Sequence, residues 1–278
     1  MVNENRNLVL ILLVLAMFTG MTIQFNEGSM PVGFLMLLGS LFLLTRINFK
    51  DLSDSGLPEV SKIRLILGIF IVLADLYWNF KTGSGFGTLD IMTIFFGLSL
   101  VGTQFSSIDI VRVSRFGTYI SSIFVVLYLI FYTLFAFLDI DFMSNFDHYF
   151  ILLPTVWVLG LAGIPLEVIA TETLRINGVE DMILTIGGPC SGLYSMFLLI
   201  GIVFGYSRVK KMEFDTTLKM LGLCIAIAYV SNLFRVIILY LTAYLYGQET
   251  MMIVHTHIGW IIFAGVAAFI IYFIDCRK

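Results

Sequence analysis

The sequence predicts an all-α polytopic membrane protein with eight to nine transmembrane helices and a short β-hairpin outside the membrane. Of its 278 residues, 59% are hydrophobic and only 13% are charged. Soluble domains average about 45–50% apolar and roughly 25% charged residues, so this composition excludes a soluble enzyme. The apolar residues form long runs, whereas the strands of a membrane β-barrel would alternate apolar and polar residues.

The net charge and the cysteine content exclude further kinds of protein and of site. The formal net charge of −3 provides no basic surface for nucleic acid, so no nucleic-acid partner is expected. The cysteines Cys190, Cys224 and Cys276 are too few and too far apart for a disulfide framework, and they form no C-x-x-C pair for zinc. We therefore expect neither a cofactor nor a metal.

Apolar segments of sufficient length are candidate spans, because a helix needs about 20 apolar residues to cross a hydrocarbon core of about 30 Å. They are residues 8–25, 31–45, 63–80, 89–104, 117–138, 149–164, 190–206, 218–246 and 254–274. The first lacks a small-x-small cleavage site and is interpreted as a span rather than a signal peptide. Segments 31–45 and 89–104 are short, and prolines interrupt or end segment 149–164.

Lysine and arginine residues predict the orientation, because cytoplasmic loops carry most of them. Loop 207–217 and the C-terminal pair 277–278 are basic and should be cytoplasmic. Segments 165–189 and 247–253 then face the outside.

In the N-terminal half, the sides of the membrane that the loop charges predict do not agree with the number of candidate spans. Loops 46–62 and 105–116 are basic and should be inside, whereas loop 139–148 is acidic and should be outside. Segment 149–164 would then begin and end outside. Either it is a re-entrant dip or one earlier segment is not a span; eight spans with both termini inside satisfy the charges.

Residues 166–188 have a different pattern from the apolar runs. Short β-branched runs surround Asn177-Gly178, the dipeptide that most strongly favours a tight hairpin turn. We predict a small extracytoplasmic β-hairpin that returns the chain to the membrane.

Residues 187–195 form the first motif, Gly-Gly-Pro-Cys-Ser-Gly-Leu-Tyr-Ser. Glycines permit a tight turn and proline favours the first helical position, so Cys190 should begin a helix at the outer boundary. Backbone N–H groups there stabilise a thiolate and can hold an oxyanion. Ser191 and Ser195 could orient this site, and Tyr194 lies one turn below Cys190. The alternative is a buried structural cysteine.

The second motif lies within the apolar segment 218–246. Arg235 is an ionisable residue in a transmembrane segment, which costs of the order of several kcal/mol and usually marks a functional site. Asn232 shares its helix face. The alternatives are that Arg235 snorkels to the interface and that Asn232 bonds a neighbouring helix.

The third motif, His255-Thr-His257-Ile-Gly259-Trp, begins the last span. His255 and Gly259 are one helical turn apart, whereas the i,i+2 spacing points the two histidines apart and disfavours a metal site. A cysteine, an arginine and a histidine at one membrane boundary suit nucleophilic catalysis. The thiolate would attack, the imidazole would transfer protons, and the guanidinium would stabilise an oxyanion.

These motifs resemble those of the exosortase/archaeosortase family of integral membrane cysteine transpeptidases. The resemblance rests on Pro-Cys190-Ser191-Gly192-Leu-Tyr-Ser, Asn232-x-x-Arg235-Val and His255-x-x-x-Gly259-Trp, in this order on the last three spans, and covers about residues 150–275. It implies a single membrane domain over residues 1–278, with N-terminal spans of undefined role in 1–148 and a catalytic half in 149–278.

The resemblance also implies roles for residues. Cys190 would be the nucleophile, Arg235 the transition-state stabiliser and His255 the general acid/base, because the family's histidine stands four residues before the glycine. The residues that would support the site or bind substrate are Ser191, Gly192, Tyr194, Ser195, Asn232 and His257.

An enzyme of this kind would lie in the plasma membrane with its active site at the extracytoplasmic face. Its partners would be exported proteins that carry a C-terminal sorting signal of a short motif, a hydrophobic helix and a basic tail. It would cleave the signal through a thioester and transfer the protein to an acceptor such as a membrane lipid.

Other classes remain as alternatives. An intramembrane cysteine peptidase would use water as the acceptor. A rhomboid-type serine peptidase is disfavoured, because Pro189 stands where the G-x-S-G pattern needs glycine. A non-enzymatic transporter or structural protein is the third class, although we find no internal repeat and the ionisable residues gather near one face rather than the midplane.

Overall fold

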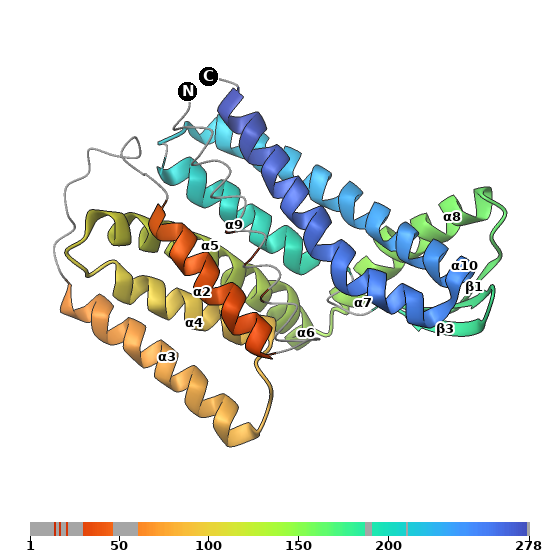
Figure 1. Cartoon of the computed structure of the whole chain (residues 1–278), viewed down its shortest axis with the longest axis horizontal. Helices are drawn as coiled ribbons and strands as arrows, with labels where there is room; N and C mark the ends of the chain where they lie inside the picture. The colour runs from red at the N-terminus through yellow and green to blue at the C-terminus, as the bar shows by residue number, and fades with distance from the viewer. Residues whose placement is uncertain are drawn as a thin grey trace.

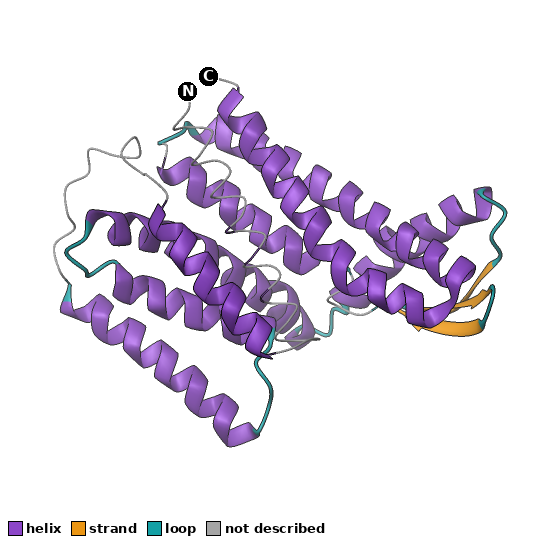
Figure 2. Cartoon of the chain, in the orientation of Figure 1, coloured by secondary structure: helices purple, strands orange, loops and turns teal. Residues whose placement is uncertain are grey.

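The computed structural model describes residues 30–46, 61–186, 191–209 and 211–276, together with Val14, Met17 and Met21. These residues form a long helical bundle with a small sheet at one end (Figures 1 and 2). Apart from the three isolated residues, which are helical, the expected span 8–25 lies outside the described residues.

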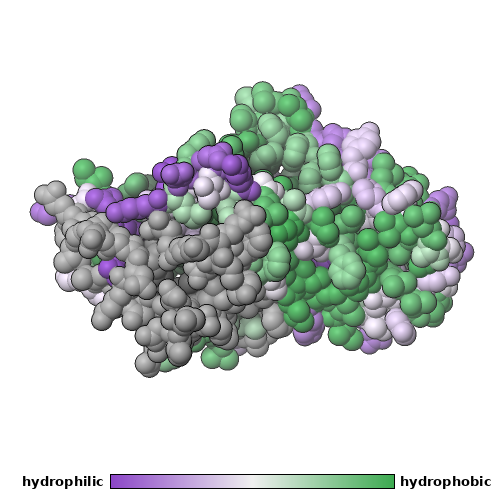
Figure 3. Space-filling view, turned by 90° about the horizontal axis from the view of Figure 1, so that it is seen from above, coloured by the Kyte–Doolittle hydropathy of each residue, from purple (hydrophilic) through white to green (hydrophobic). Residues whose placement is uncertain are grey.

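The N-terminal half forms a layer of apolar helices: α2 (Met30–Arg46), α3 (Lys62–Thr82), α4 (Thr88–Gly102) and α5 (Ile108–Tyr128). Helices α3 and α4 cross closely, since a Cβ on Gly68 would lie 2.6 Å from the Gly97 carbonyl oxygen. Such small-residue contacts let helices pack within a membrane. Exposed apolar side chains cover the outer face of α3, among them Ile63 and Phe70, and hydrophobic residues cover much of the described surface in Figure 3.

Helix α5 corrects one predicted boundary. Residues 105–116 were expected as a loop, but α5 begins at Ile108, and Ser107 adopts the extended backbone of an N-cap residue. Arg112 and Arg115 therefore lie in the first turns of a helix. The same helical path continues through a π-helical turn, η2 (Leu129–Leu134), to α6 (Phe135–Phe137).

Three helical stretches within the described residues are long and apolar enough to cross a membrane: Lys62–Thr82, Ile110–Phe137 and Phe214–His255. Helix α4 and the helix α9 (Leu193–Val209) are apolar but shorter. The chain thus has the character of a membrane protein.

The expected acidic loop 139–148 is largely helical, which corrects a second prediction. Helix α7 (Phe142–Phe146) is capped by Asp141, whose carboxylate accepts the Ser144 N–H at 3.2 Å. It continues through a π-helical turn, η3 (Asp147–Leu152), into α8 (Leu153–Leu161). Helix α8 lies beside the end of the bundle that carries the sheet (Figure 1).

The predicted hairpin provides two of the strands of a three-stranded antiparallel sheet with strand order β1-β2-β3. The strands are β1 (Leu166–Ala170), β2 (Thr173–Asn177) and β3 (Asp181–Thr185). The turn after Asn177 is confirmed, since Asn177 pairs with Asp181. The prediction missed the first hairpin, because its turn, Thr171-Glu172, has neither glycine nor asparagine to mark it.

Helix α10 (Phe214–Cys276) contains both of the last two expected spans. Its backbone leaves the helical region only at Gly247, with φ 82° and ψ 179°, so the expected outer segment 247–253 is a sharp kink followed directly by helix. We call residues 214–246 the first arm and 248–276 the second arm. The second arm folds back along the first (Figure 1).

The sheet is docked on this kink. The Val179 N–H donates to the Tyr244 carbonyl at 3.0 Å, and the Gln248 N–H donates to the Glu180 carboxylate at 3.1 Å. Glu180 therefore caps the start of the second arm, where a negative charge is favourable.

Buried hydrophobic residues form two clusters. One joins α5 and α9 to the first half of the first arm and includes Phe124, Phe197 and Ala228. The other joins α8 and the sheet to the remainder of that arm and includes Leu174 and Val236. The residues of the second motif, Asn232 and Arg235, lie between Ala228 and Val236, so they stand at the junction of the two clusters.

Candidate active site

The described part of the first motif begins at Ser191, since Cys190 and residues 187–189 lie outside the described residues. Ser191 is buried, and its carbonyl oxygen accepts the Asn232 Nδ2 at 2.7 Å. Its hydroxyl accepts the Leu193 N–H at 3.3 Å, at the start of α9. The residue bonded to Cys190 is therefore fixed both by α10 and by its own helix.

Both the backbone conformation at position 192 and the nearby Asn232 side chain require a glycine there. Its φ of +79° lies in the left-handed region, which side chains with a Cβ rarely adopt. A Cβ at this position would also lie 2.3 Å from the Asn232 Cγ. The Ser-Gly pair of the first motif therefore fits against the asparagine of the second.

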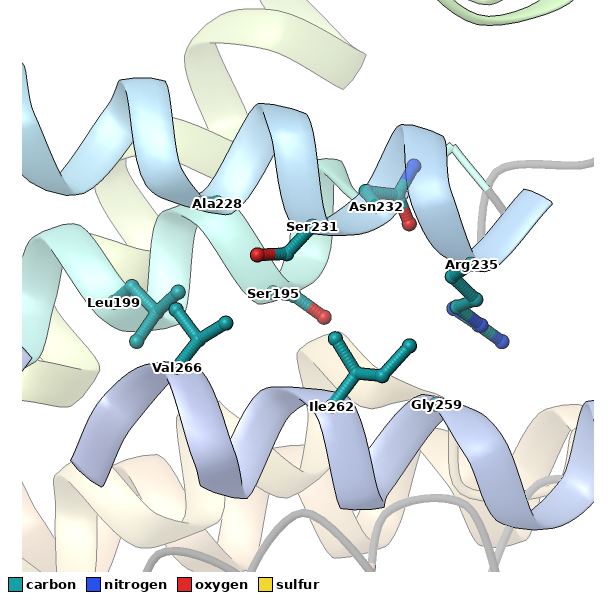
Figure 4. A pocket seen from close by; sticks show the side chains of 9 residues that line it. All are labelled: Ser195, Leu199, Ala228, Ser231, Asn232, Arg235, Gly259, Ile262 and Val266. Carbon is teal, nitrogen blue, oxygen red and sulfur yellow. The ribbon is translucent and has the colours of Figure 1, made fainter. Parts of the chain in front are cut away.

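Arg235 connects the second motif to the third. A Cβ on Gly259 would lie only 2.9 Å from the Arg235 Cζ, so the guanidinium lies against the bare backbone of the second arm. Figure 4 shows Arg235 extending from the first arm toward Gly259. The glycine of the third motif thus provides room for the arginine of the second.

A small pocket of about 20 Å³ lies between α9 and the two arms of α10. Its lining residues are Ser195, Leu199, Ala228, Ser231, Asn232, Arg235, Gly259, Ile262 and Val266. The hydroxyls of Ser195 and Ser231 point into the space between these helices (Figure 4). A space of this size and polarity is enough for about one water molecule.

The two histidines lie on different faces of the second arm. His255 is partly buried and stands one turn before Gly259, the residue that contacts Arg235. His257 is exposed, with Nδ1 2.9 Å from the Ile253 carbonyl oxygen. It lines a wide hollow of about 690 Å³ together with Glu180 and Glu249. The arrangement therefore places His255, rather than His257, on the Arg235 side.

Tyr194 is not among the residues that line this pocket. Its ring lies in an aromatic cluster with centroid distances of 5.4 Å to Tyr132 and 5.8 Å to Tyr128. Its contacts thus attach α9 to the helical path of α5, η2 and α6, which is a supporting position.

Asp147 is a residue of the site that the sequence reasoning missed. It was expected in an acidic loop outside the membrane, but it lies in η3 and the residue is only 1% exposed. Burial and the nearby Glu172 carboxylate raise its pKa to about 7, and a hydrogen bond from Ser191 opposes this shift. The available signal was its position, since this acid stands two residues before the apolar segment 149–164.

The apolar helices indicate a helical membrane protein. The described residues of the three separated motifs form a polar junction in it, which is the candidate site. The sequence model of the transmembrane exosortase family (Exosortase_EpsH) matches residues 24–272. The chain belongs to this family, as the resemblance predicts. Searches of curated proteins and of solved structures found no match.

Proposed function

We propose that the chain is a membrane-embedded cysteine transpeptidase that removes the C-terminal sorting signal of exported proteins. The observation that supports this most is the meeting of the three motifs: Asn232 bonds Ser191, and Arg235 contacts Gly259. These contacts bring the neighbour of the thiol, the guanidinium and the face of His255 to one junction. Family membership supports the same reaction class.

In the proposed first step, the Cys190 thiolate attacks the carbonyl carbon of the scissile peptide bond. Arg235, which stays charged at all working pH values, stabilises the oxyanion of the tetrahedral intermediate. The C–N bond then breaks, and protonated His255 gives its proton to the leaving amine. The products are a thioester on Cys190 and a released C-terminal segment.

In the second step an acceptor attacks the thioester carbonyl. His255, now neutral, removes the acceptor's proton, and the C–S bond breaks to regenerate the thiolate. The acceptor is a nucleophile that reaches the site from the membrane, such as a lipid head group. Water at the same position would give a peptidase instead.

The depth of the site suits a substrate with a hydrophobic tail. Arg235 follows Phe214 by 21 residues, which is about 31 Å along a helix. This length matches a hydrocarbon core of about 30 Å, so Arg235 lies near the outer boundary of the plasma membrane when Phe214 lies at the inner one. A substrate helix in the bilayer would present the residues that precede it at this level.

The test compares source cells that carry the wild-type chain with cells that carry Cys190→Ala, using intact mass spectrometry of exported proteins. We expect proteins with a C-terminal hydrophobic helix and basic tail to lose this segment only in wild-type cells, and to gain the mass of an acceptor. Cys224→Ala is the matched control, because Cys224 is a buried residue of α10 that the mechanism does not use. Loss of the C-terminal segment in Cys190→Ala cells as well would refute the proposal, and a wild-type product without added mass would indicate water as the acceptor.

A further inference from the structure

Asp147 is an acid in a place that disfavours charge. It is buried, it stands in the π-helical turn η3, and its Oδ1 has no hydrogen-bond partner among the described residues. Burying an incompletely paired carboxylate is costly, and π-helical turns are frequent at functional sites. The groups that the Asp147 carboxylate contacts therefore indicate why it is buried.

The carboxylate contacts Ser191, the residue that follows the proposed nucleophile in the sequence. Ser191, which follows Cys190 directly, hydrogen-bonds the Asp147 side chain. On the other side of that segment, the Ile186 N–H donates to the Glu172 carbonyl oxygen at 2.8 Å. Ile186 and Ser191 are thus bonded to Glu172 and to Asp147, respectively, and these two acids are close enough to interact electrostatically.

The two attachment points are joined to each other. The Ser144 hydroxyl donates to the Glu172 carboxylate, and His148 Nδ1 lies 2.8 Å from the Thr171 carbonyl oxygen. Helix α7 and the turn η3 are therefore tied to the β1–β2 turn. This frame fixes Asp147 relative to the strand that leads into the cysteine segment.

We propose that Asp147 is a positioning residue for Cys190: its carboxylate accepts the Ser191 hydroxyl and thereby fixes Ser191, to which Cys190 is joined by a peptide bond. This inference rests on the proposed role of Cys190 as the nucleophile. Asp147 acts through Ser191 and transfers no proton to the substrate.

The ionised carboxylate is the stronger acceptor, so positioning depends on its charge. Among the described residues that face it, the charged or titratable groups are Glu172 of the β1–β2 turn and Tyr132 of η2. Burial and Glu172 place the pKa of Asp147 at about 7. The Ser191 bond is thus strong above pH 7, and it weakens as the pH falls through 7 and the carboxyl gains a proton.

The experiment measures how fast a membrane-impermeant maleimide labels Cys190 in native membranes between pH 6 and 8. The rate for Cys190→Ala membranes is subtracted. Asp147→Asn keeps the size of the side chain and removes its charge, and Asp139→Asn is the matched control, because Asp139 is an exposed acid. The ratio of wild-type to variant rates cancels the titration of the thiol itself.

We expect Asp147→Asn to lower the labelling rate by at least about tenfold at pH 8, the loss of one hydrogen bond to a charged group, and to leave it near wild type at pH 6. Asp147→Glu should restore part of the rate at pH 8, and Asp139→Asn should match wild type throughout. A ratio that is near one, or that does not change with pH, would overturn the proposal.

A second variant protects the test against misfolding of Asp147→Asn. Glu172→Gln keeps an oxygen to accept the Ser144 hydroxyl but removes the charge that raises the pKa of Asp147. The pH at which labelling falls should therefore move downward, and an unmoved profile would contradict the proposal. Labelling does not require turnover, so a chain whose Cys190→Ala variant still processes its substrates would refute the proposed function without deciding this inference.

Discussion

Replacing Gly192 by alanine should disrupt the contact between the first and second motifs. At φ +79° a residue with a Cβ costs about 1–2 kcal/mol relative to glycine. The new methyl group would lie 2.3 Å from the Asn232 Cγ, so the asparagine must move and its bond to the Ser191 carbonyl oxygen is lost. That bond contributes about 1 kcal/mol. The total of about 2–3 kcal/mol corresponds to a loss of about 30- to 150-fold in processing rate if all of it is felt in the placement of Cys190.

A double-mutant cycle separates the contact from the backbone effect. In an Asn232→Ala background the side-chain clash is absent, so Gly192→Ala should cost only the backbone component, and the two substitutions should couple by about 1 kcal/mol. The processing rate in membranes is the readout, with thermal stability measured in parallel. Gly222→Ala is the matched control, because a Cβ at Gly222 meets no atom within 4 Å. Wild-type processing by Gly192→Ala, or coupling below about 0.3 kcal/mol, would refute the reasoning.

Four further substitutions test the remaining residues of the candidate site. Arg235→Lys keeps the charge but loses the planar fork of donors, so we expect processing to fall by at least about 100-fold; near-wild-type activity would exclude an oxyanion role. Gly259→Ala should cause a smaller loss, because its methyl group would push on the Arg235 Cζ from 2.9 Å, and wild-type activity would show that this contact is irrelevant. His255→Ala should abolish processing, whereas His257→Ala should change it less than about threefold because His257 faces the outer hollow. A larger loss of processing in His257→Ala than in His255→Ala would assign the general acid/base role to His257 instead.

The apolar segments predicted the helices well, because a run of apolar residues is a local property of the sequence. The predicted position of the hairpin turn is confirmed, since Asn177 pairs with Asp181 across it. The connection is three residues long, 178–180, and neither Asn177 nor Gly178 adopts the positive φ of a two-residue Asn-Gly turn. The boundary of α5 was wrong because Arg112 and Arg115 were interpreted as loop residues. Charged residues at a membrane boundary can occupy helix ends as readily as loops.

The course of the chain around residue 247 depends on tertiary contacts and was not predictable. Gly247 marks a sharp kink, and the sequence pattern resembles that of two spans with a loop between them. The loop is absent because the β2–β3 turn bonds Tyr244 and Gln248 on either side of the glycine. These partners are more than 60 residues away in the sequence, so no local pattern could indicate them.

In the candidate site, too, the motifs could be recognised from the local sequence, whereas their contacts depend on the tertiary structure. The three motifs were expected to lie close together, and their described residues do meet, since Asn232 bonds Ser191 and Arg235 lies against Gly259. Their pairing was not predictable, since the spacing in sequence does not say that Gly192 fits Asn232 or that Gly259 makes room for Arg235. Asp147 was missed because its burial depends on the packing of η3 beside Ser191.

The most direct measurement of the central claim is the isolation of the acyl-enzyme. The full-length protein would be purified from membranes of source cells, digested, and analysed for the peptide that contains Cys190, with and without neutral hydroxylamine, which cleaves thioesters. We expect a fraction of Cys190 to carry an acyl group that hydroxylamine removes, with Cys224 unmodified. The absence of any such adduct on Cys190 would contradict covalent catalysis by this cysteine.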